Sequence, residues 1–443
     1  MLTISDAPGA HDVARGEKAV VVGVEFQGRG NSRSTEAKLD EAVGLARAIG
    51  VDVVAARTFR LKTPRPSTLL GKGQTEEIAQ IAKGNEAGLL IVDAALTPVQ
   101  QKSLEEEAGA KVIDRTSLIL EIFGERAATA EGRLQVELAH LDYQAGRLVR
   151  SWTHLERQRG GAGFLGGPGE TQIEADRRIL QEKIVKLKRE LETVRRTREL
   201  HRAKRRKVPY PIVAIVGYTN AGKSTLFNRL TGADVTAEDM LFATLDPTLR
   251  RLRLPHGTVV ILSDTVGFIS DLPTHLIAAF RATLEEVVEA DLVIHLRDIS
   301  DPDTAAQAED VERILADLGV DASDTKRVIE VWNKIDLLDE GNRSRLLADA
   351  ADGSKGPPIA ISAVTGEGID ALKAVIETRM AGELEDLTVT IGPAQFGLVD
   401  WLYRNGDIVS RTDNEDGSAT ISLKATQSAR EEIESRLRRK NNG

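Results

Sequence analysis

Apolar residues in the first third of the chain form short β-branched runs that alternate with segments of helical spacing. The runs are KAVVVGVEF, VDVVAARTF, GLLIVDAAL and AKVIDRT, all between residues 18 and 116. Segments such as STEAKLDEAVGLARAIG lie between them and carry apolar residues three or four positions apart. This alternation predicts an α/β domain with a mainly parallel sheet, which we place at residues 1–156.

A glycine-rich stretch and a long helical segment follow, at residues 157–208. Six of the ten residues from 160 to 169 are glycine, which excludes the interior of a helix or strand there. From Glu170 to about Lys207 the chain has no Gly or Pro, so we expect one helix of about 38 residues or two antiparallel helices. Its apolar face is expected to carry Ile173, Ile179 or Leu180, Ile184, Leu187, Leu191 and Val194.

Two more domains are expected after this helical arm. Strand and helix patterns alternate again over residues 209–382. Residues 383–443 contain the runs LEDLTVTIG, DIVSRTD and GSATISLKA and two helical segments, which predict a small α+β domain of βαββα order. DNEDG, at 413–417, supplies the turn of its hairpin.

Composition excludes several classes of protein. The chain contains no cysteine, so it has no disulfides, thiolate metal sites or cysteine nucleophiles. Its 7 histidines show no metal-ligand spacing, so a zinc enzyme is not expected. No apolar run approaches the roughly 18 residues of a membrane span, and the first residues lack the layout of a signal peptide. We therefore expect a cytoplasmic protein without stable membrane insertion. A monomer is expected as well.

Charge is distributed unevenly along the chain. The formal net charge is −9, but the segment from Lys183 to Lys207 has 12 Lys or Arg and 3 Glu, a local charge of +9, so the rest carries −18. The protein therefore presents its positive charge at one place, the helical arm.

The first chemistry-bearing motif is GYTNAGKST, directly after the strand PIVAIV. It fits G-x-x-x-x-G-K-[ST] in the strand–loop–helix context that a phosphate-binding loop requires. Glycines let backbone N–H groups turn toward the phosphates. Lys223 is expected to reach the terminal phosphates, and the hydroxyl of Ser224 to bind Mg²⁺.

A second motif, SDTVGF, contributes Asp264 and Gly267. The carboxylate is expected outside the Mg²⁺ shell or holding a water of the ion, and the glycine N–H on the γ-phosphate. These positions come after the phosphate loop in the order that a GTPase needs.

Two further motifs are suited to reading guanine. In NKID, the carboxylate of Asp336 can accept hydrogen bonds from the N1–H and the N2 amine of guanine, and adenine offers neither donor there. In SAVTGEG, the backbone of Ser362 and Ala363 is expected to meet guanine O6. Because all four motifs follow strands, the site should lie at the carboxyl edge of a parallel sheet.

The switch threonine has two candidates in LFATLDPTLRR. FATLDPT resembles the switch of related GTPases, whose second threonine binds the metal, which favours Thr244 over Thr248. Asn220 matches an asparagine that helps bind K⁺ in the TrmE group of GTPases, so K⁺ joins Mg²⁺ as a candidate cofactor.

The complete set of expected site residues combines these motifs. GTP contacts are expected from Gly217, Tyr218, Thr219, Asn220, Ala221, Gly222, Lys223, Ser224, Thr225, Phe242, Ala243, Thr244, Leu245, Asp246, Asp264, Thr265, Val266, Gly267, Asn333, Lys334, Ile335, Asp336, Ser362 and Ala363. Lys223, Thr244 and Gly267 are expected to act in catalysis, and Ser224 and Thr244 to bind the metal.

One position departs from the pattern of Ras-type enzymes. They carry a glutamine after D-x-x-G that orients the attacking water, and this chain has Phe268 there. A phenyl ring can neither donate nor accept a hydrogen bond. Whether the ring faces the site or packs under the switch, hydrolysis is expected to be slow and partner-dependent.

The stretch RQRGGAGFLGGPGETQIEADRR, at residues 157–178, resembles the signature of the HflX-type GTPases, of the TrmE-Era-Obg-like superfamily. It occurs with GYTNAGKST, FATLDPT, DTVGF and PTHLIAAFRATLEEV, and the resemblance runs from about residue 18 to 380. It implies an N-terminal α/β domain, a helical arm, a P-loop GTPase domain with a parallel sheet and a small C-terminal domain. It also implies a cytoplasmic GTPase that binds GTP and GDP and the large ribosomal subunit, and that helps split stalled or idle ribosomes, notably under heat stress.

The basic arm and the glycine stretch agree with that implication, because neutralising phosphates provides affinity for ribosomal RNA. The alternatives are a solvated two-helix hairpin that packs on its own domain, and a plain flexible linker. Trp152 is a candidate for base stacking or for a buried core position. At the level of function, the alternatives are a ribosome-assembly GTPase and a scaffold whose nucleotide state regulates a membrane protease.

Overall fold

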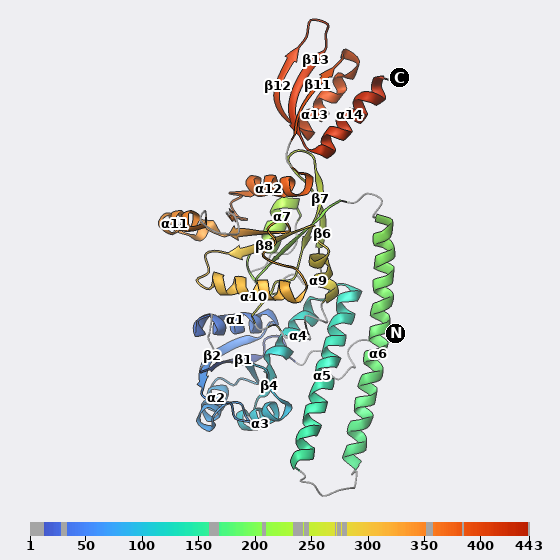
Figure 1. Cartoon of the computed structure of the whole chain (residues 1–443). Coiled ribbons are helices and arrows are strands. Elements are labelled where there is room, and N and C mark those ends of the chain that lie inside the picture. Colours follow the sequence, from blue (N-terminus) through green and yellow to red (C-terminus); the bar gives the residue numbers. More distant parts are fainter. Residues whose placement is uncertain are drawn as a thin grey trace. The chain divides into compact units, whose positions relative to one another are not determined.

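The computed structural model (Figure 1) describes residues 13–27, 33–158, 168–205, 210–233, 242, 248–270, 272, 276, 281–350, 358–382 and 385–441. By its internal contacts the chain forms two compact units. The first contains residues 1–207, 238–246 and 270–283, and the second contains residues 208–237, 247–269 and 284–443. Two short segments near the nucleotide motifs thus belong to the N-terminal unit.

The N-terminal domain is a four-stranded parallel sheet in the order β2-β1-β3-β4. Buried aliphatic side chains of the strands face α1 and α4 on one side and α2 and α3 on the other (Figure 1). The elements are β1 (Lys18–Phe26), α1 (Thr35–Ala48), β2 (Asp52–Leu61), α2 (Lys72–Gly84), β3 (Leu89–Asp93), α3 (Pro98–Ala108), β4 (Lys111–Asp114) and α4 (Arg115–Arg126). The expected parallel α/β domain is confirmed for this region.

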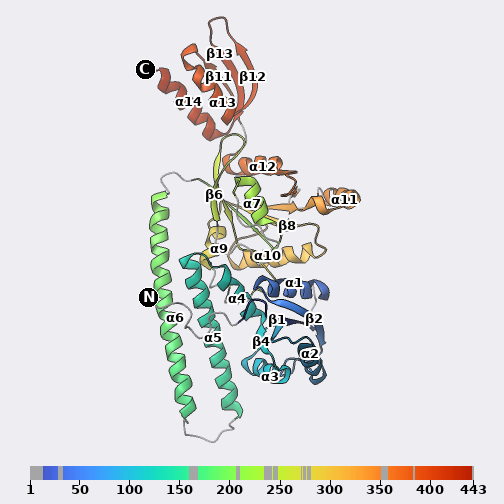
Figure 2. The same ribbon diagram turned by 180° about the vertical axis from the view of Figure 1, so that it is seen from behind.

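The helical arm is an antiparallel pair, α5 (Ala130–Gln158) and α6 (Pro168–Arg205), which run side by side in both views (Figures 1 and 2). Of the two structures expected for the basic segment, one continuous helix of 38 residues is found. The segment before α6 differs from the expected alternation of strands and helices. Between β4 and residue 158 the chain consists of two helices, α4 and α5, and a short connection. Leu138 and Leu141 of α5 pack against Ile184, Leu187 and Leu191 of α6.

This packing settles which residue belongs to the apolar face of α6. Leu180 packs against the α5–α6 core, whereas Ile179 is 49% exposed. The turn of about 100° per residue places 180, 184, 187 and 191 on one stripe, so position 179 falls outside it.

The second unit contains a six-stranded sheet in the order β10-β9-β8-β5-β7-β6, parallel except for β6. Helices α7 and α12 cover one face and α10 the other (Figure 1). The elements are β5 (Ile212–Gly217), α7 (Lys223–Thr231), β6 (Thr248–Arg253), β7 (Val259–Asp264), α9 (Arg281–Val288), β8 (Leu292–Asp298), α10 (Thr304–Asp317), β9 (Val328–Asn333), η2 (Ile335–Leu337), α11 (Glu340–Ala350), β10 (Ile359–Ala360) and α12 (Ile369–Ala381).

The C-terminal residues fold as an antiparallel sheet in the order β11-β13-β12 with two helices on one face. The elements are β11 (Glu385–Ile391), η3 (Pro393–Leu398), α13 (Val399–Asn405), β12 (Asp407–Asp413), β13 (Ala419–Ala425) and α14 (Gln427–Asn441). This is the expected βαββα order, and the α/β fold class as a whole is confirmed. Among the helices that the structure describes, none combines the length and apolarity needed to cross a membrane.

Candidate nucleotide site

The four sequence motifs meet at the carboxyl edge of the parallel sheet in the second unit. Gly217 ends β5, Asp264 ends β7 and Asn333 ends β9, and Ser362 follows β10. Parallel strands bring these ends to one edge, where doubly wound folds bind their ligands. The structure therefore brings together motifs that lie up to about 150 positions apart in the sequence.

The amide of Asn333 joins the phosphate loop to the SAV loop. Its Nδ2 donates to the carbonyl of Ala221 at 2.8 Å, and its Oδ1 accepts from the N–H of Ala363 at 3.0 Å. Gly222 makes this approach possible: it has φ +91°, and a Cβ there would lie 2.3 Å from Asn333 Nδ2. One side chain thus sets the relative position of three motifs.

Lys223 is the first residue of α7, and its side chain is buried against the phosphate loop. Its ammonium donates to the carbonyl of Tyr218 at 2.7 Å. Burial lowers its pKa from the usual 10.5 to about 8, against the opposing effect of Asp264. A Cβ at Gly267 would lie 2.9 Å from Lys223 Nζ, so only glycine lets the second motif approach this cation.

Ser224 and Asp264 form the second contact between the phosphate loop and the D-x-x-G motif. The serine Oγ donates to Asp264 Oδ2 at 2.8 Å. A hydroxyl and a carboxylate converging at a helix N-terminus are the hard oxygen ligands that Mg²⁺ prefers. The donor set therefore fits a magnesium ion.

At the expected guanine end, Asp336 lies in η2 and is exposed. Within the part of the chain that the structure describes, no hydrogen bond or ion pair engages its carboxylate. The neighbouring Lys334 has φ +67° and pairs with Asp298 at 2.7 Å. The turn therefore leaves Asp336 available for a ligand.

Phe268 is fully buried. Its N–H donates to the carbonyl of Gly217 at 3.1 Å, and its carbonyl accepts from the N–H of Thr219 at 2.7 Å. These two bonds attach the D-x-x-G segment to the phosphate loop by its backbone. Burial of the ring agrees with the interpretation that it packs under the switch.

Most of the expected switch I residues, Ala243, Thr244, Leu245 and Asp246, lie outside the described residues. Phe242 is described and belongs to the N-terminal unit. It has φ +58°, unusual for a bulky residue. Its buried ring packs edge-on against Phe123 of α4, with ring centroids 4.8 Å apart.

Three residues after Gly267, Ser270 takes part in a buried polar network within the N-terminal unit. Its Oγ donates to Glu41 of α1 at 2.9 Å, and its carbonyl accepts from Arg115 of α4 at 2.8 Å. Arg115 also pairs with Glu41 at 2.6 Å and with Asp93. Helix α4 therefore contacts Phe242 of FATLDPT through Phe123, and Ser270, which follows SDTVGF, through Arg115.

Sequence reasoning missed Glu41, Arg115 and Ser270. The two hydrogen bonds of Ser270 span 229 and 155 positions, and no spacing rule connects residues so far apart. The available signal was the burial of charged residues in otherwise apolar elements, because Arg and Glu are seldom buried unless they are paired.

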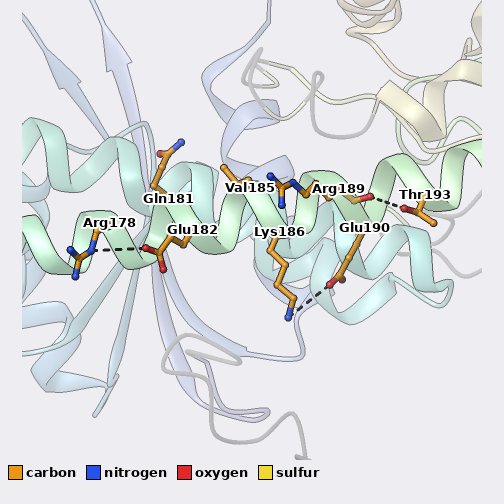
Figure 3. A pocket seen from close by; sticks show the side chains of 8 residues that line it. All are labelled: Arg178, Gln181, Glu182, Val185, Lys186, Arg189, Glu190 and Thr193. Atoms are coloured by element: carbon orange, nitrogen blue, oxygen red, sulfur yellow. Dashed lines mark hydrogen bonds and ion pairs between the residues drawn. The ribbon is translucent and has the colours of Figure 1, made fainter.

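Some charges on the outward face of α6 are paired within the helix. Figure 3 shows a shallow pocket along this face, with Arg178 paired to Glu182 and Lys186 to Glu190. Over the described part of α6, no ion pair is found for Arg177, Lys183, Lys188 and Arg189, whose side chains are exposed. Lys183, Lys188 and Arg189 belong to the basic segment that the sequence located, and Arg177 precedes it. The side chain of Trp152 lies outside the described residues.

Comparison with protein families assigns most of the chain to known models. Residues 36–124 match "GTP-binding GTPase N-terminal", residues 126–205 "GTP-binding GTPase Middle Region", residues 212–334 "50S ribosome-binding GTPase" and residues 347–442 "HflX C-terminal domain".

Individual relatives agree with these models. GTPase HflX of Magnetococcus marinus is 54% identical over 86% of this chain and 87% of its own length. GTPase HflX of Escherichia coli is 43% identical over 92% of this chain and 93% of its own length. A GDP-bound GTP-binding protein from Sulfolobus solfataricus is similar with a TM-score of 0.43 and 23% identity, over 82% of this chain and 98% of that one.

Proposed function

This chain belongs to the HflX family of GTPases, and from that membership we propose that it binds the large ribosomal subunit and splits stalled or idle ribosomes, notably under heat stress. The chain is a GTP hydrolase by family and fold. The ribosome and its RNA as partners, the splitting reaction and a monomeric cytoplasmic protein are the proposed parts.

The observation that carries the proposal is the match of residues 212–334 to the ribosome-binding GTPase model. The unpaired cations of α6 support it, because exposed Lys and Arg side chains gain affinity for RNA by neutralising phosphates. They lie on a helix stiffened by its packing against α5, which suits contact with a large, preformed RNA surface.

We assign the nucleotide contacts from the geometry of the carboxyl edge. Lys223 would bind the terminal phosphates, and Ser224 with Asp264 would hold Mg²⁺, which supplies charge neutralisation on those phosphates when bound. Thr244 would complete that site, with K⁺ near Asn220 as a second cofactor. Asn333 would order the loops, while Asp336 and the backbone of Ser362 and Ala363 would read guanine.

The experiment is sedimentation of the full-length protein with ribosomal particles, together with light scattering of intact ribosomes. With a non-hydrolysable GTP analogue, the protein should pellet with mature large subunits, and the scattering of intact ribosomes should fall. With GDP both signals should be weaker. The matched control is Ser224→Ala, which removes the proposed metal ligand.

Each alternative function predicts a different result. An assembly factor would prefer immature particles and leave the scattering unchanged. A scaffold for a membrane protease would pellet with neither particle. Either result overturns the splitting proposal, and only the second removes the ribosome as a partner.

A further inference from the structure

Arg229, in the last turn of α7, contacts the SAV loop, residues 362–368, which follows β10. Its Nε donates to the carbonyl of Ala363 at 3.0 Å, and its Nη2 donates to the carbonyl of Val364. The guanidinium lies against Gly366, where a Cβ would be 3.5 Å from Nη1. A planar cation with fixed donors thus holds two successive carbonyls of one loop.

The loop depends on such outside contacts for its position. Its internal hydrogen bonds close a turn: Ser362 accepts from the N–H of Thr365 at its Oγ, at 3.0 Å, and from the N–H of Gly366 at its carbonyl, at 2.9 Å. These bonds shape the turn, but they do not connect it to the phosphate loop. Among the described contacts, Asn333 connects Ala363 to Ala221 of the phosphate loop, and Arg229 connects the carbonyl of Ala363 to α7, the helix that follows that loop.

Helix α7 links this contact to phosphate binding. The helix begins at Lys223 and carries Arg229 six residues later, about 9 Å along its axis at 1.5 Å per residue. One rigid element therefore holds both the cation expected at the phosphates and the cation that holds the base loop.

We propose that Arg229 is a positioning residue for guanine. It fixes the SAV loop against α7, and so fixes the distance between the loop that meets the base and Lys223, which meets the phosphates. The proposal rests on the proposed role of Ser362 and Ala363 in meeting guanine O6. If the loop is loosened, the hydrogen bonds to O6 weaken, while the contacts of Asp336 with the N1 and N2 donors remain. The effect of Arg229 is therefore specific to the O6 position of the base.

The test measures the affinity of three diphosphates: GDP, 6-thio-GDP, which has a poorer acceptor at position 6, and IDP, which lacks the N2 amine. Arg229→Met keeps the alkyl stem and removes both donors. It should weaken GDP binding by about tenfold, or about 1.4 kcal/mol. It should also lower the preference for GDP over 6-thio-GDP by at least about threefold, and leave the preference for GDP over IDP unchanged.

Two further variants make the result specific. Arg229→Lys can donate to one carbonyl and should recover part of both losses, which a change in general stability would not do. Arg313→Met, on the exposed face of α10, is the matched control and should leave all three affinities unchanged.

If the loss of Arg229 weakens binding of all three diphosphates equally and both preferences are retained, Arg229 acts only on stability. That result overturns the inference. Unchanged GDP affinity overturns it as well. Asp336→Asn separates this outcome from failure of the proposed function: it should lower the preference for GDP over IDP. If it does not, the assignment of the base-reading residues fails, whatever Arg229 does.

Discussion

Lys223 is a buried cation whose charge depends on pH in the physiological range. Its pKa of about 8 in the free protein results mainly from burial. Nucleotide phosphates favour the protonated form, so binding above this pKa requires uptake of a proton. Affinity should therefore be constant well below the pKa and fall as the pH rises through it.

We expect the Kd for GDP to increase roughly eightfold between about pH 7.5 and about pH 9, as follows from the fraction of protonated Lys223. Titration of GDP by fluorescence at each pH measures it. Lys223→Arg is the control, because its guanidinium stays charged over this range and the pH dependence should disappear. Equal Kd values for the wild type at both pH values would contradict the prediction.

Asp336 decides the choice of base if its exposed carboxylate accepts from guanine N1–H and N2. Asp336→Asn should weaken GTP binding by about 2–4 kcal/mol, since a charge-assisted contact is lost. It should also improve binding of xanthosine triphosphate, because the amide can donate to the O2 of xanthine. Competition between the two nucleotides measures the exchange. Equal GTP affinity in mutant and wild type would refute this assignment.

At the level of elements, α1 and α4 are joined by buried charges beside Ser270. Glu41 lies between Arg33 and Arg115, and the side chains of all three are at most 9% exposed. Burial alone would lower the pKa of Arg115, but Asp93 and Glu41 outweigh it and raise that pKa. The network therefore stays ionised, and it depends on every partner being present.

Glu41→Gln should cost about 3–5 kcal/mol of unfolding free energy, because it leaves two buried guanidinium groups around a neutral amide. Urea denaturation of the full chain measures the loss, and hydrogen exchange should locate it in α1 and α4. Asp40→Asn, at an exposed position of the same helix, is the control. A loss below about 1 kcal/mol would show that the network contributes little.

On α6, we expect binding to ribosomal particles to depend on the unpaired cations. Changing Arg177, Lys183, Lys188 and Arg189 to Gln should flatten the salt dependence of binding by up to about 3–4 logarithmic units per decade of salt. The control changes Arg178, Glu182, Lys186 and Glu190 to Gln. These residues form two ion pairs, so the net charge of α6 stays the same. If both variants bind with the wild-type salt slope, the arm is a solvated hairpin without an RNA contact.

At the scale of the whole molecule, hydrolysis is expected to depend on the partner. Phe268 is buried where Ras-type enzymes have a water-orienting glutamine, so nucleophile positioning must be supplied when the switch is ordered. Purified large subunits should raise kcat by at least about tenfold, equivalent to roughly 1.4 kcal/mol of barrier. A free protein that turns over faster than about one per second, without response to subunits, would show that an internal residue already completes the site.

The division of the chain into units is also a property of the whole molecule. Residues 238–246, which include Phe242 of FATLDPT, and residues 270–283, which follow the D-x-x-G motif, group with the N-terminal residues by their contacts. Sequence boundaries placed both segments in the GTPase domain, at 209–382, because contiguity is all that composition and periodicity can follow. Packing of Phe242 on Phe123 and the bonds of Ser270 produce the different grouping.

The sequence by itself determined the features that are local. The four nucleotide motifs, their order after strands, the parallel sheets and the length of α6 follow from residue types within a few turns or one strand. The apolar spacing of Ile184, Leu187 and Leu191 likewise predicted the face of α6 that is buried. Local rules suffice there because neighbouring positions share a backbone geometry.

Tertiary structure decided the contacts between distant positions. The choice of Leu180 over Ile179, the network of Glu41 with Ser270 and the bonds of Arg229 to residues 134 and 135 positions away appear only when elements pack. A lone exposed arginine on a helix predicts no partner, because its long side chain can reach many. Packing against a particular loop selects one of them, and this selection leaves no periodic trace in the sequence.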